Sequence, residues 1–146
     1  MLLISHRGNI FGIDKEKENS PKQIEHAIKQ GYDVEIDVWS YDFRWFLGHD
    51  YPEYEVNFNF IYDNSKNLWC HAKNLEALHS MCNSGIRCFW HENDDFTLTS
   101  DNKIWTYPLK NVTENSIIVC RNVFETKRHY RQKIYGICSD FVGLVI

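Results

Sequence analysis

The sequence predicts an α/β fold, a trimmed TIM-like (β/α) barrel in which loops replace several helices. Short apolar runs alternate with amphipathic segments in the first half of the chain, as strands alternate with helices in such folds. Polar residues gather where the apolar runs end, which favours a site at the carboxyl ends of parallel strands. A complete barrel takes about 250 residues. The chain has 146 residues, so we expect a single domain over residues 1–146 with fewer helices than a full barrel.

The composition limits the class of protein. A hydrophobic content of 43% is enough for one core, and a net charge of -4 with scattered basic residues argues against a nucleic-acid partner. Neither a secretory signal nor a stable membrane anchor is recognisable, so we expect a cytoplasmic location. The five cysteines are odd in number and lie mostly in apolar runs, which predicts reduced thiols rather than a disulfide framework. The sequence leaves the oligomeric state open.

The first predicted unit is a strand, a helix and a second strand. Residues 2–5 form a buried strand. Ser20 is a capping residue and Pro21 a first-turn residue, and together they begin a helix that Gly31 ends. Residues 34–38 form the second strand, so the two strands are expected to run parallel.

The rest of the chain predicts more strands than helices. Residues 45–48 are a short extended arm, and residues 52–67 are irregular because their aromatic residues have no steady period. A strand over residues 68–71 is followed by a helix that Asn74 caps and Gly85 ends. Further strands are expected over residues 87–91, 103–107, 116–120 and 135–139, with one more helix within 124–132.

The strand over residues 34–38 carries the candidate metal ligands. Alternation along a strand places the carboxylates of Glu35 and Asp37 on one face and the three aliphatic side chains on the other. Two acids on one face repel each other unless a cation, a basic residue or a proton lies between them, which makes the pair a candidate divalent-metal site. An acidic solvent-facing strand is the alternative. The neighbouring strand ends favour a site, because they add His6, Arg7, His49, Asp50, His71 and Lys73.

A series of motifs occurs in order along the chain: His6-Arg7-Gly8, Glu18-Asn19-Ser20, residues 31–38, Asp42, Gly48-His49-Asp50, Lys73, Trp105-Thr106 and residues 136–140. In these motifs the chain resembles the glycerophosphodiester phosphodiesterase family of the phosphatidylinositol-phospholipase-like barrels. The match is dense in the first fifty residues and sparse afterwards. The resemblance implies a TIM-like barrel, a divalent metal ion and hydrolysis of a phosphodiester that carries a neighbouring hydroxyl group.

The resemblance also implies roles for individual residues. His6 and His49 would be the acid/base pair, and the metal would rest on Glu35 and Asp37. The basic contacts to the phosphate would come from Arg7, as a clamp, and Lys73. Glu18 would orient a histidine or join the metal shell, and the other residues expected around the site are Asn19, Asp50 and Trp105.

His71 departs from the family, which normally has a glutamate at this position. Strand alternation places His71 on the same face as Lys73, so we expect the imidazole to replace a carboxylate in the metal shell. The metal would then be Mg²⁺, Mn²⁺ or Ca²⁺, with a transition metal favoured if His71 ligates, because imidazole is a softer donor than carboxylate. The competing interpretation is that His71 faces solvent or phosphate.

Two functions follow from these residues. The first is metal-dependent hydrolysis of a small glycerophosphodiester in lipid metabolism, with the two histidines as acid and base. The alternative is a catalytically inactive barrel that binds a phosphorylated ligand. The presence of both His6 and His49 favours the enzyme, because binding alone needs no pair of proton carriers.

Overall fold

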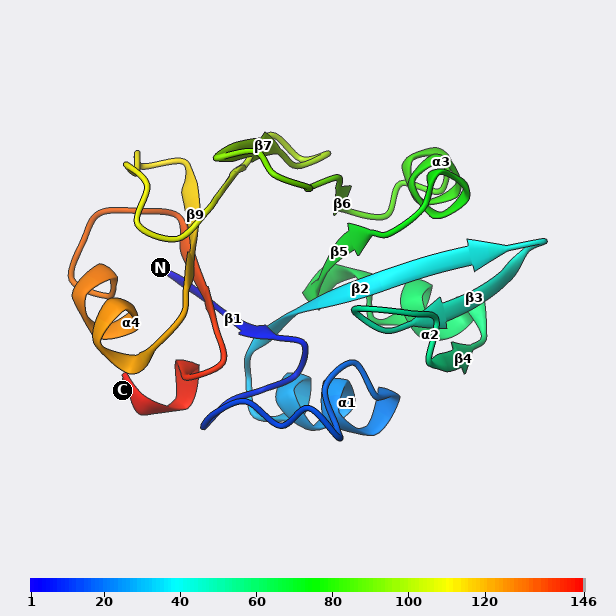
Figure 1. Cartoon of the computed structure of the whole chain (residues 1–146), viewed down its shortest axis with the longest axis horizontal. Helices are drawn as coiled ribbons and strands as arrows, with labels where there is room; N and C mark the ends of the chain where they lie inside the picture. The colour runs from blue at the N-terminus through cyan, green and yellow to red at the C-terminus, as the bar shows by residue number, and fades with distance from the viewer. Residues whose placement is uncertain (146) are drawn as a thin grey trace.

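A computed structural model describes residues 1–145 and is organised around one curled, ten-stranded sheet (Figure 1). The helices are α1 (Pro21–Lys29), α2 (Phe58–Asp63), α3 (Leu75–Asn83), α4 (Val123–His129) and the short 3₁₀ turns η1 (Ser65–Asn67) and η2 (Val142–Leu144). The strands are β1 (Leu2–His6), β2 (Asp33–Tyr41), β3 (Arg44–Leu47), β4 (Tyr54–Val56), β5 (Leu68–Ala72), β6 (Cys88–Phe89), β7 (Phe96–Leu98), β8 (Ile104–Thr106), β9 (Ser116–Cys120) and β10 (Gly136–Ser139).

The sheet mixes parallel and antiparallel strands around the long strand β2. Its order is β4-β3-β2-β1-β10-β9-β8-β7, and β5 pairs with β2 and then with β6. The pairs β8–β9, β9–β10, β10–β1, β1–β2, β2–β5 and β5–β6 are parallel. The pairs β2–β3, β3–β4 and β7–β8 are antiparallel. Most of the sheet therefore directs the carboxyl ends of its strands to one edge.

The prediction of a trimmed TIM-like (β/α) barrel is wrong: the sheet forms a curled half-barrel of mixed strand direction. The first departure is the turn between β2 and β3, where Asp42 and Phe43 have φ angles of 50° and 64°. Two consecutive residues with positive φ make the tight hairpin turn whose twist suits antiparallel strands. A parallel return would need a crossover of a dozen or more residues, and no such segment separates these strands.

Helix capping signals in the sequence are confirmed. The Ser20 side chain accepts a hydrogen bond from the Gln23 amide at the start of α1, and Asn74 accepts one from the Ala77 amide at the start of α3. The prediction of an irregular segment over residues 52–67 is wrong, because β4, α2 and η1 lie there. These elements and β7, which was also not predicted, are too short to establish a hydrophobic period.

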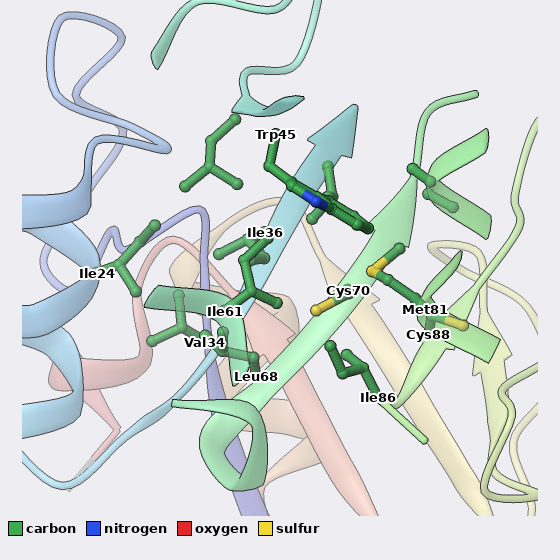
Figure 2. Close-up of a cluster of buried hydrophobic side chains, with 14 of the residues drawn as sticks. Ile24, Val34, Ile36, Trp45, Ile61, Leu68, Cys70, Met81, Ile86 and Cys88 are labelled. Carbon is green, nitrogen blue, oxygen red and sulfur yellow. The ribbon is translucent and has the colours of Figure 1, made fainter. Parts of the chain in front are cut away.

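The main hydrophobic core lies between the outer face of the sheet and helices α1, α2 and α3 (Figure 2). Strand alternation is confirmed here, because Val34, Ile36 and Val38 are fully buried in this core while Glu35 and Asp37 lie on the opposite face of β2. The parallel register aligns Asp37 with His71 of β5. The aliphatic face of β2 thus anchors the strand, and its acidic face is left to form a site.

The inner face of the curled sheet holds a second, more aromatic cluster. Trp105 stacks on Phe89 with ring centroids 4.3 Å apart and lies beside Trp69. All five cysteines are free, as predicted, and four of them are buried. None of the helices in residues 1–145 combines the length and hydropathy that crossing a membrane requires.

Asn74 provides a test of how the β2–β3 hairpin is joined to the core. Its side chain caps α3 and also bonds both backbone groups of Ser40, with N–O distances of 3.1 and 2.7 Å. Asn74→Ala is expected to lower the free energy of unfolding by about 2 kcal/mol, because a cap is lost and buried backbone groups lose their partners. Urea denaturation would measure this.

The control is Ser20→Ala, which removes a cap alone and is expected to cost about 1 kcal/mol. Equal losses in the two variants would contradict a bridging role for Asn74.

Candidate active site

A pocket of about 240 Å³ opens at the edge where the carboxyl ends of the parallel strands meet. It is lined by the sequence-predicted residues His6, Arg7, Glu35, His49, His71 and Trp105. The other lining residues are His91, Tyr107, Pro108, Val119 and Arg121. The structure thus brings together side chains that are far apart in the sequence.

Glu35, Asp37 and His71 form a group that fits a divalent cation. One ligand atom from each lies within 4.8 Å of the others, and the two carboxylates are 3% and 0% exposed. Glu35 Oε2 and Asp37 Oδ1 are buried without a hydrogen-bond partner among the described residues. Buried carboxylate oxygens without partners are costly, and a cation would satisfy them. These residues therefore suit the metal that the sequence predicted.

The orientation of His71 supports the assignment of Glu35, Asp37 and His71 as a cation site. Nε2 lies 3.0 Å from the carbonyl oxygen of His91, so it carries the proton and donates it. Nδ1 then holds the lone pair and lies 3.2 Å from Asp37 Oδ1 and 3.9 Å from Glu35 Oε1. A lone pair that faces two carboxylates needs a cation or a proton between them. A backbone carbonyl behind the imidazole is the usual support for a metal-binding histidine.

The two carboxylates have opposite pKa shifts. Burial and the charge of Asp37 raise the pKa of Glu35, against the charges of His6 and Arg7. Burial also acts to raise the pKa of Asp37, but the nearby imidazoles of His49 and His71 and the charge of Arg7 hold it well below its usual range. Asp37 is therefore the more acidic of the two carboxyl groups.

Asn19 fixes the position of Asp37. Its Nδ2 donates to Asp37 Oδ2 at 2.9 Å, and its Oδ1 accepts from the Asp37 amide at 3.0 Å. Asn19 is 1% exposed and has a φ angle of 63°, a conformation that asparagine tolerates better than most residues. The sequence prediction placed Asn19 near the site, and the structure makes it the clamp on one carboxylate.

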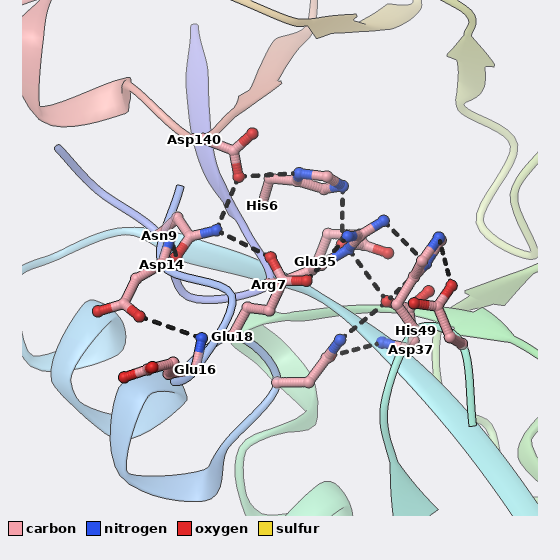
Figure 3. A network of polar contacts seen from close by, with 12 residues as sticks. His6, Arg7, Asn9, Asp14, Glu16, Glu18, Glu35, Asp37, His49 and Asp140 are labelled. Atoms are coloured by element: carbon pink, nitrogen blue, oxygen red, sulfur yellow. Dashed lines mark hydrogen bonds and ion pairs between the residues drawn. The ribbon is translucent and has the colours of Figure 1, made fainter. Parts of the chain in front are cut away.

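Arg7 is bonded to protein partners on each side of its guanidinium group. Nη1 donates to Glu18 Oε1 at 3.2 Å, Nη2 donates to His49 Nδ1 at 2.8 Å, and Nε lies 3.2 Å from Asp37 Oδ2 (Figure 3). Glu18 was expected to orient a histidine or to join the metal shell, but it contacts Arg7 and Asn9 instead. The two hydrogen bonds do not use every N–H of the guanidinium group, so others remain for a phosphate.

His6 is positioned by an aspartate that follows the last strand. Nδ1 of His6 lies 3.0 Å from Asp140 Oδ1, and Nε2 lies 3.8 Å from Glu35 Oε2 (Figure 3). Burial lowers the pKa of His6, but the hydrogen bond to Asp140 and the charges of Glu35 and Asp140 outweigh it, so the pKa is raised above 6.5. The ring thus presents Nε2 to the pocket from a fixed orientation.

His49 and Lys73 approach Asp37 from two other segments. His49 Nδ1 lies 3.4 Å from Asp37 Oδ2, and Lys73 Nζ lies 4.0 Å from Asp37 Oδ1. Gly48 sets the path of the chain before His49: its φ is 154°, and a Cβ atom there would collide with the carbonyl oxygen of Tyr51. Asp50, expected beside the site, is largely exposed and lies 3.8 Å from His49 Nε2.

Three residues of the site had no role in the sequence prediction. Asp140 belongs to a motif that was recognised, and its position directly after β10 could have indicated a role at the strand edge. His91 likewise follows β6. Asn9 donates to Asp140 at 2.8 Å from within a buried loop, and no sequence signal marks it.

Comparison with known proteins adds no relative to this picture. No family model and no curated protein matches the chain. The resemblance to the glycerophosphodiester phosphodiesterases therefore remains a prediction from the motifs, and the functional argument rests on the geometry of the site.

Asp140→Asn is expected to lower the pKa of His6 in the metal-free protein, because the opposing effect of burial remains after the charge is removed. A histidine with a raised pKa stabilises the fold below pH 6.5 and loses this contribution as the pH rises through the folded pKa. The variant should lose that stabilisation, and an NMR titration of the imidazole protons would measure the pKa. Asp94→Asn is the control, and an unchanged His6 pKa in Asp140→Asn would contradict the pairing.

Mn²⁺ is expected to raise the melting temperature by about 5 °C at concentrations near 100 times its Kd, as ligand binding to the folded state alone predicts. Differential scanning fluorimetry with and without the ion would measure the shift. Glu35→Gln should abolish it, whereas Glu18→Gln should keep it, because Glu18 contacts Arg7 rather than the three candidate ligands. The opposite pattern would place the ion elsewhere.

Proposed function

We propose that the protein is a metal-dependent phosphodiesterase acting on a small glycerophosphodiester. The observation that carries the proposal is the meeting of two imidazoles and a buried carboxylate–imidazole group in one pocket. Phosphodiester cleavage needs charge stabilisation at the phosphate, a base for the nucleophile and an acid for the leaving oxygen. This set of side chains offers each of them.

Glu35, Asp37 and His71 would hold the cation. When bound, a divalent ion at such ligands acts as a Lewis acid toward a phosphate oxygen and lowers the pKa of a hydroxyl group. Lys73 lies beside the same group and adds positive charge where the phosphate would bind. These residues are assigned to binding and charge stabilisation, not to proton transfer.

His6 is assigned as the general acid. Asp140 accepts a hydrogen bond from Nδ1 and helps to raise the pKa of the ring, so the imidazolium form persists to higher pH than in a free histidine. Nε2 then carries the proton that passes to the leaving alkoxide, which departs as an alcohol. The arrangement of a carboxylate that orients a proton-carrying histidine is the one used in many hydrolases.

His49 is assigned as the general base, and Arg7 sets when it can act. In the present arrangement Arg7 donates to Nδ1, so the neutral ring carries its proton on Nε2. A base at Nε2 needs the proton on Nδ1 instead, and Asp37 Oδ2 lies 3.4 Å away to accept the hydrogen bond. Arg7 would turn its Nη2 from His49 to the phosphate at this stage, and His49 would take the proton of the neighbouring hydroxyl group of the substrate as it attacks. The cyclic phosphate formed in this step would then be opened by water, which completes the hydrolysis.

A phosphorylated-ligand binder without activity is the second candidate. It is favoured by the several partners that hold Arg7, because a guanidinium group held on several sides is a rigid feature. A screen of Mg²⁺, Mn²⁺, Co²⁺ and Ca²⁺ against several glycerophosphodiesters and bis(p-nitrophenyl) phosphate separates the two candidates. Turnover with at least one metal supports the enzyme, and saturable binding without turnover supports the binder.

His6→Ala and His49→Ala are each expected to lower kcat by at least about 100-fold, the usual contribution of a general acid or base. Stopped assays at saturating substrate would measure the loss. His79→Ala is the control, because His79 lies exposed on α3 and bonds only to Asn83. A variant of His6 or His49 with near-normal turnover would remove that residue from the mechanism.

His71→Glu is expected to move the metal preference of the activity from Mn²⁺ or Co²⁺ toward Mg²⁺ or Ca²⁺. An imidazole suits transition metals, whereas a third carboxylate oxygen suits harder cations. Activity measured across the four metals for both proteins tests this, and identical profiles would show that His71 is not a ligand.

A further inference from the structure

The side chains of four residues that line the pocket have no role in the proposed hydrolysis: His91, Trp105, Tyr107 and Arg121. We call this set the distal wall; it adjoins the metal group at His91, whose carbonyl oxygen accepts from His71 Nε2. These residues come from the segments that follow β6, β8 and β9 and from β8 itself. A phosphate bound between His6 and His49 would direct one of its two alcohols toward this wall.

Most of the distal wall is held in place before any ligand binds. His91 Nδ1 lies 2.9 Å from Asp94 Oδ2, and the other oxygen of Asp94 accepts from the Glu92 amide at 3.0 Å. Trp105 is 4% exposed and stacks on Phe89. Fixed side chains lose little conformational entropy when a ligand binds, which is a property of built binding sites.

Arg121 is held at the mouth of the pocket by the first turn of α4. Its amide donates to Glu125 Oε2 at 2.9 Å, and Nη2 donates to Glu125 Oε1 at 3.2 Å. These bonds leave Nη1 and Nε of the guanidinium group available among the described residues. Arg121 can therefore donate to a ligand without giving up its support.

The distal wall offers the hydrogen-bonding groups that a hydroxyl-rich molecule needs. Because His91 Nδ1 donates a hydrogen bond to Asp94, the neutral ring keeps an acceptor at Nε2. Arg121 is a donor, and the Tyr107 hydroxyl both donates and accepts. Hydroxyl groups also donate and accept, so a polyol can pair with all three residues while its carbon atoms contact Trp105.

A quaternary ammonium group fits this wall poorly. It can neither donate nor accept a hydrogen bond, so the free N–H groups of Arg121, His91 Nε2 and the Tyr107 hydroxyl would stay unpaired beside it. Glu125 balances the charge of Arg121, so the discrimination rests on these unpaired groups. A site built to pair with hydroxyl groups discriminates strongly against a group that leaves those partners unpaired.

We propose that the distal wall binds the leaving alcohol of the diester and selects a neutral polyol, such as glycerol, over a quaternary ammonium alcohol such as choline. The assignment of this alcohol as the leaving group rests on the proposed function. The pocket volume of about 240 Å³ suits this class, because it lies below the usual range for larger ligands, which begins at about 300 Å³.

The test compares the binding of glycerophosphoglycerol and glycerophosphocholine by titration calorimetry with Mn²⁺ present. The measurements use the His6→Ala protein, so that turnover does not consume the diesters. The glycerol diester is expected to bind at least about tenfold more tightly. Adding Tyr107→Phe should weaken its binding about three- to tenfold, the usual effect of losing one hydrogen bond. Adding Arg121→Ala should bring the two affinities closer together.

Arg44→Ala is the matched control for Arg121. Arg44 pairs with Glu55 on the exposed β3–β4 hairpin, as Arg121 pairs with Glu125, but it does not line the pocket. Its removal should leave the ratio of affinities unchanged. Circular dichroism of each variant would show that the fold is intact.

The proposal is overturned if the choline diester binds as tightly as the glycerol diester, if neither binds, or if both distal-wall variants keep the original ratio. Hydrolysis of glycerophosphoglycerol and glycerophosphocholine by the wild-type protein is measured separately. Absence of that hydrolysis with every metal, together with a binding preference that Arg121→Ala reduces, would refute the proposed reaction and leave the polyol site standing.

Discussion

The burial of two carboxylates on one face of β2 is the constraint on which the rest of the site depends. Glu35 and Asp37 are anchored from behind by the aliphatic face of the same strand, so neither can turn toward water without moving the core. Their mutual repulsion at low exposure has to be offset locally. Arg7 provides positive charge and Asn19 provides hydrogen bonds. His71 faces both acids with a lone pair, so a cation bound between the three side chains would offset the remaining repulsion.

This constraint explains why the polar network is large and why it crosses so many elements. Asp140 at the end of β10 orients His6 at the end of β1, and Arg7 joins the loop before α1 to the segment after β3. Each partner reduces the cost of leaving another buried polar group unpaired. A network of this kind is sensitive to the removal of any one member, because the remaining partners lose both a charge and a hydrogen bond.

The curled mixed sheet positions the site without the complete architecture of a (β/α)₈ barrel. Parallel pairing from β8 through β9, β10, β1 and β2 to β5 is sufficient to gather the strand ends at one edge. The antiparallel strands have other roles. The β2–β3 hairpin positions His49 at the site, and β7 pairs with β8, which carries Trp105. A site at the carboxyl ends of these strands therefore depends on their parallel direction more than on closure of the barrel or on the number of helices.

The sequence by itself determined the strand with alternating acids and the capped helices, because these follow from periodicity and capping over a few neighbouring residues. The pocket residues that it predicted came from positions at strand ends and from the resemblance of the motifs. It could not determine the mixed direction of the sheet, since the turn at Asp42 and Phe43 decides it through backbone angles that their side chains do not signal. Only the tertiary structure showed that Asp140 orients His6, that Arg7 is already bonded to His49, and that His91 and Arg121 lie across the pocket. Those contacts join residues distant in the chain, and their geometry depends on how the strands pair.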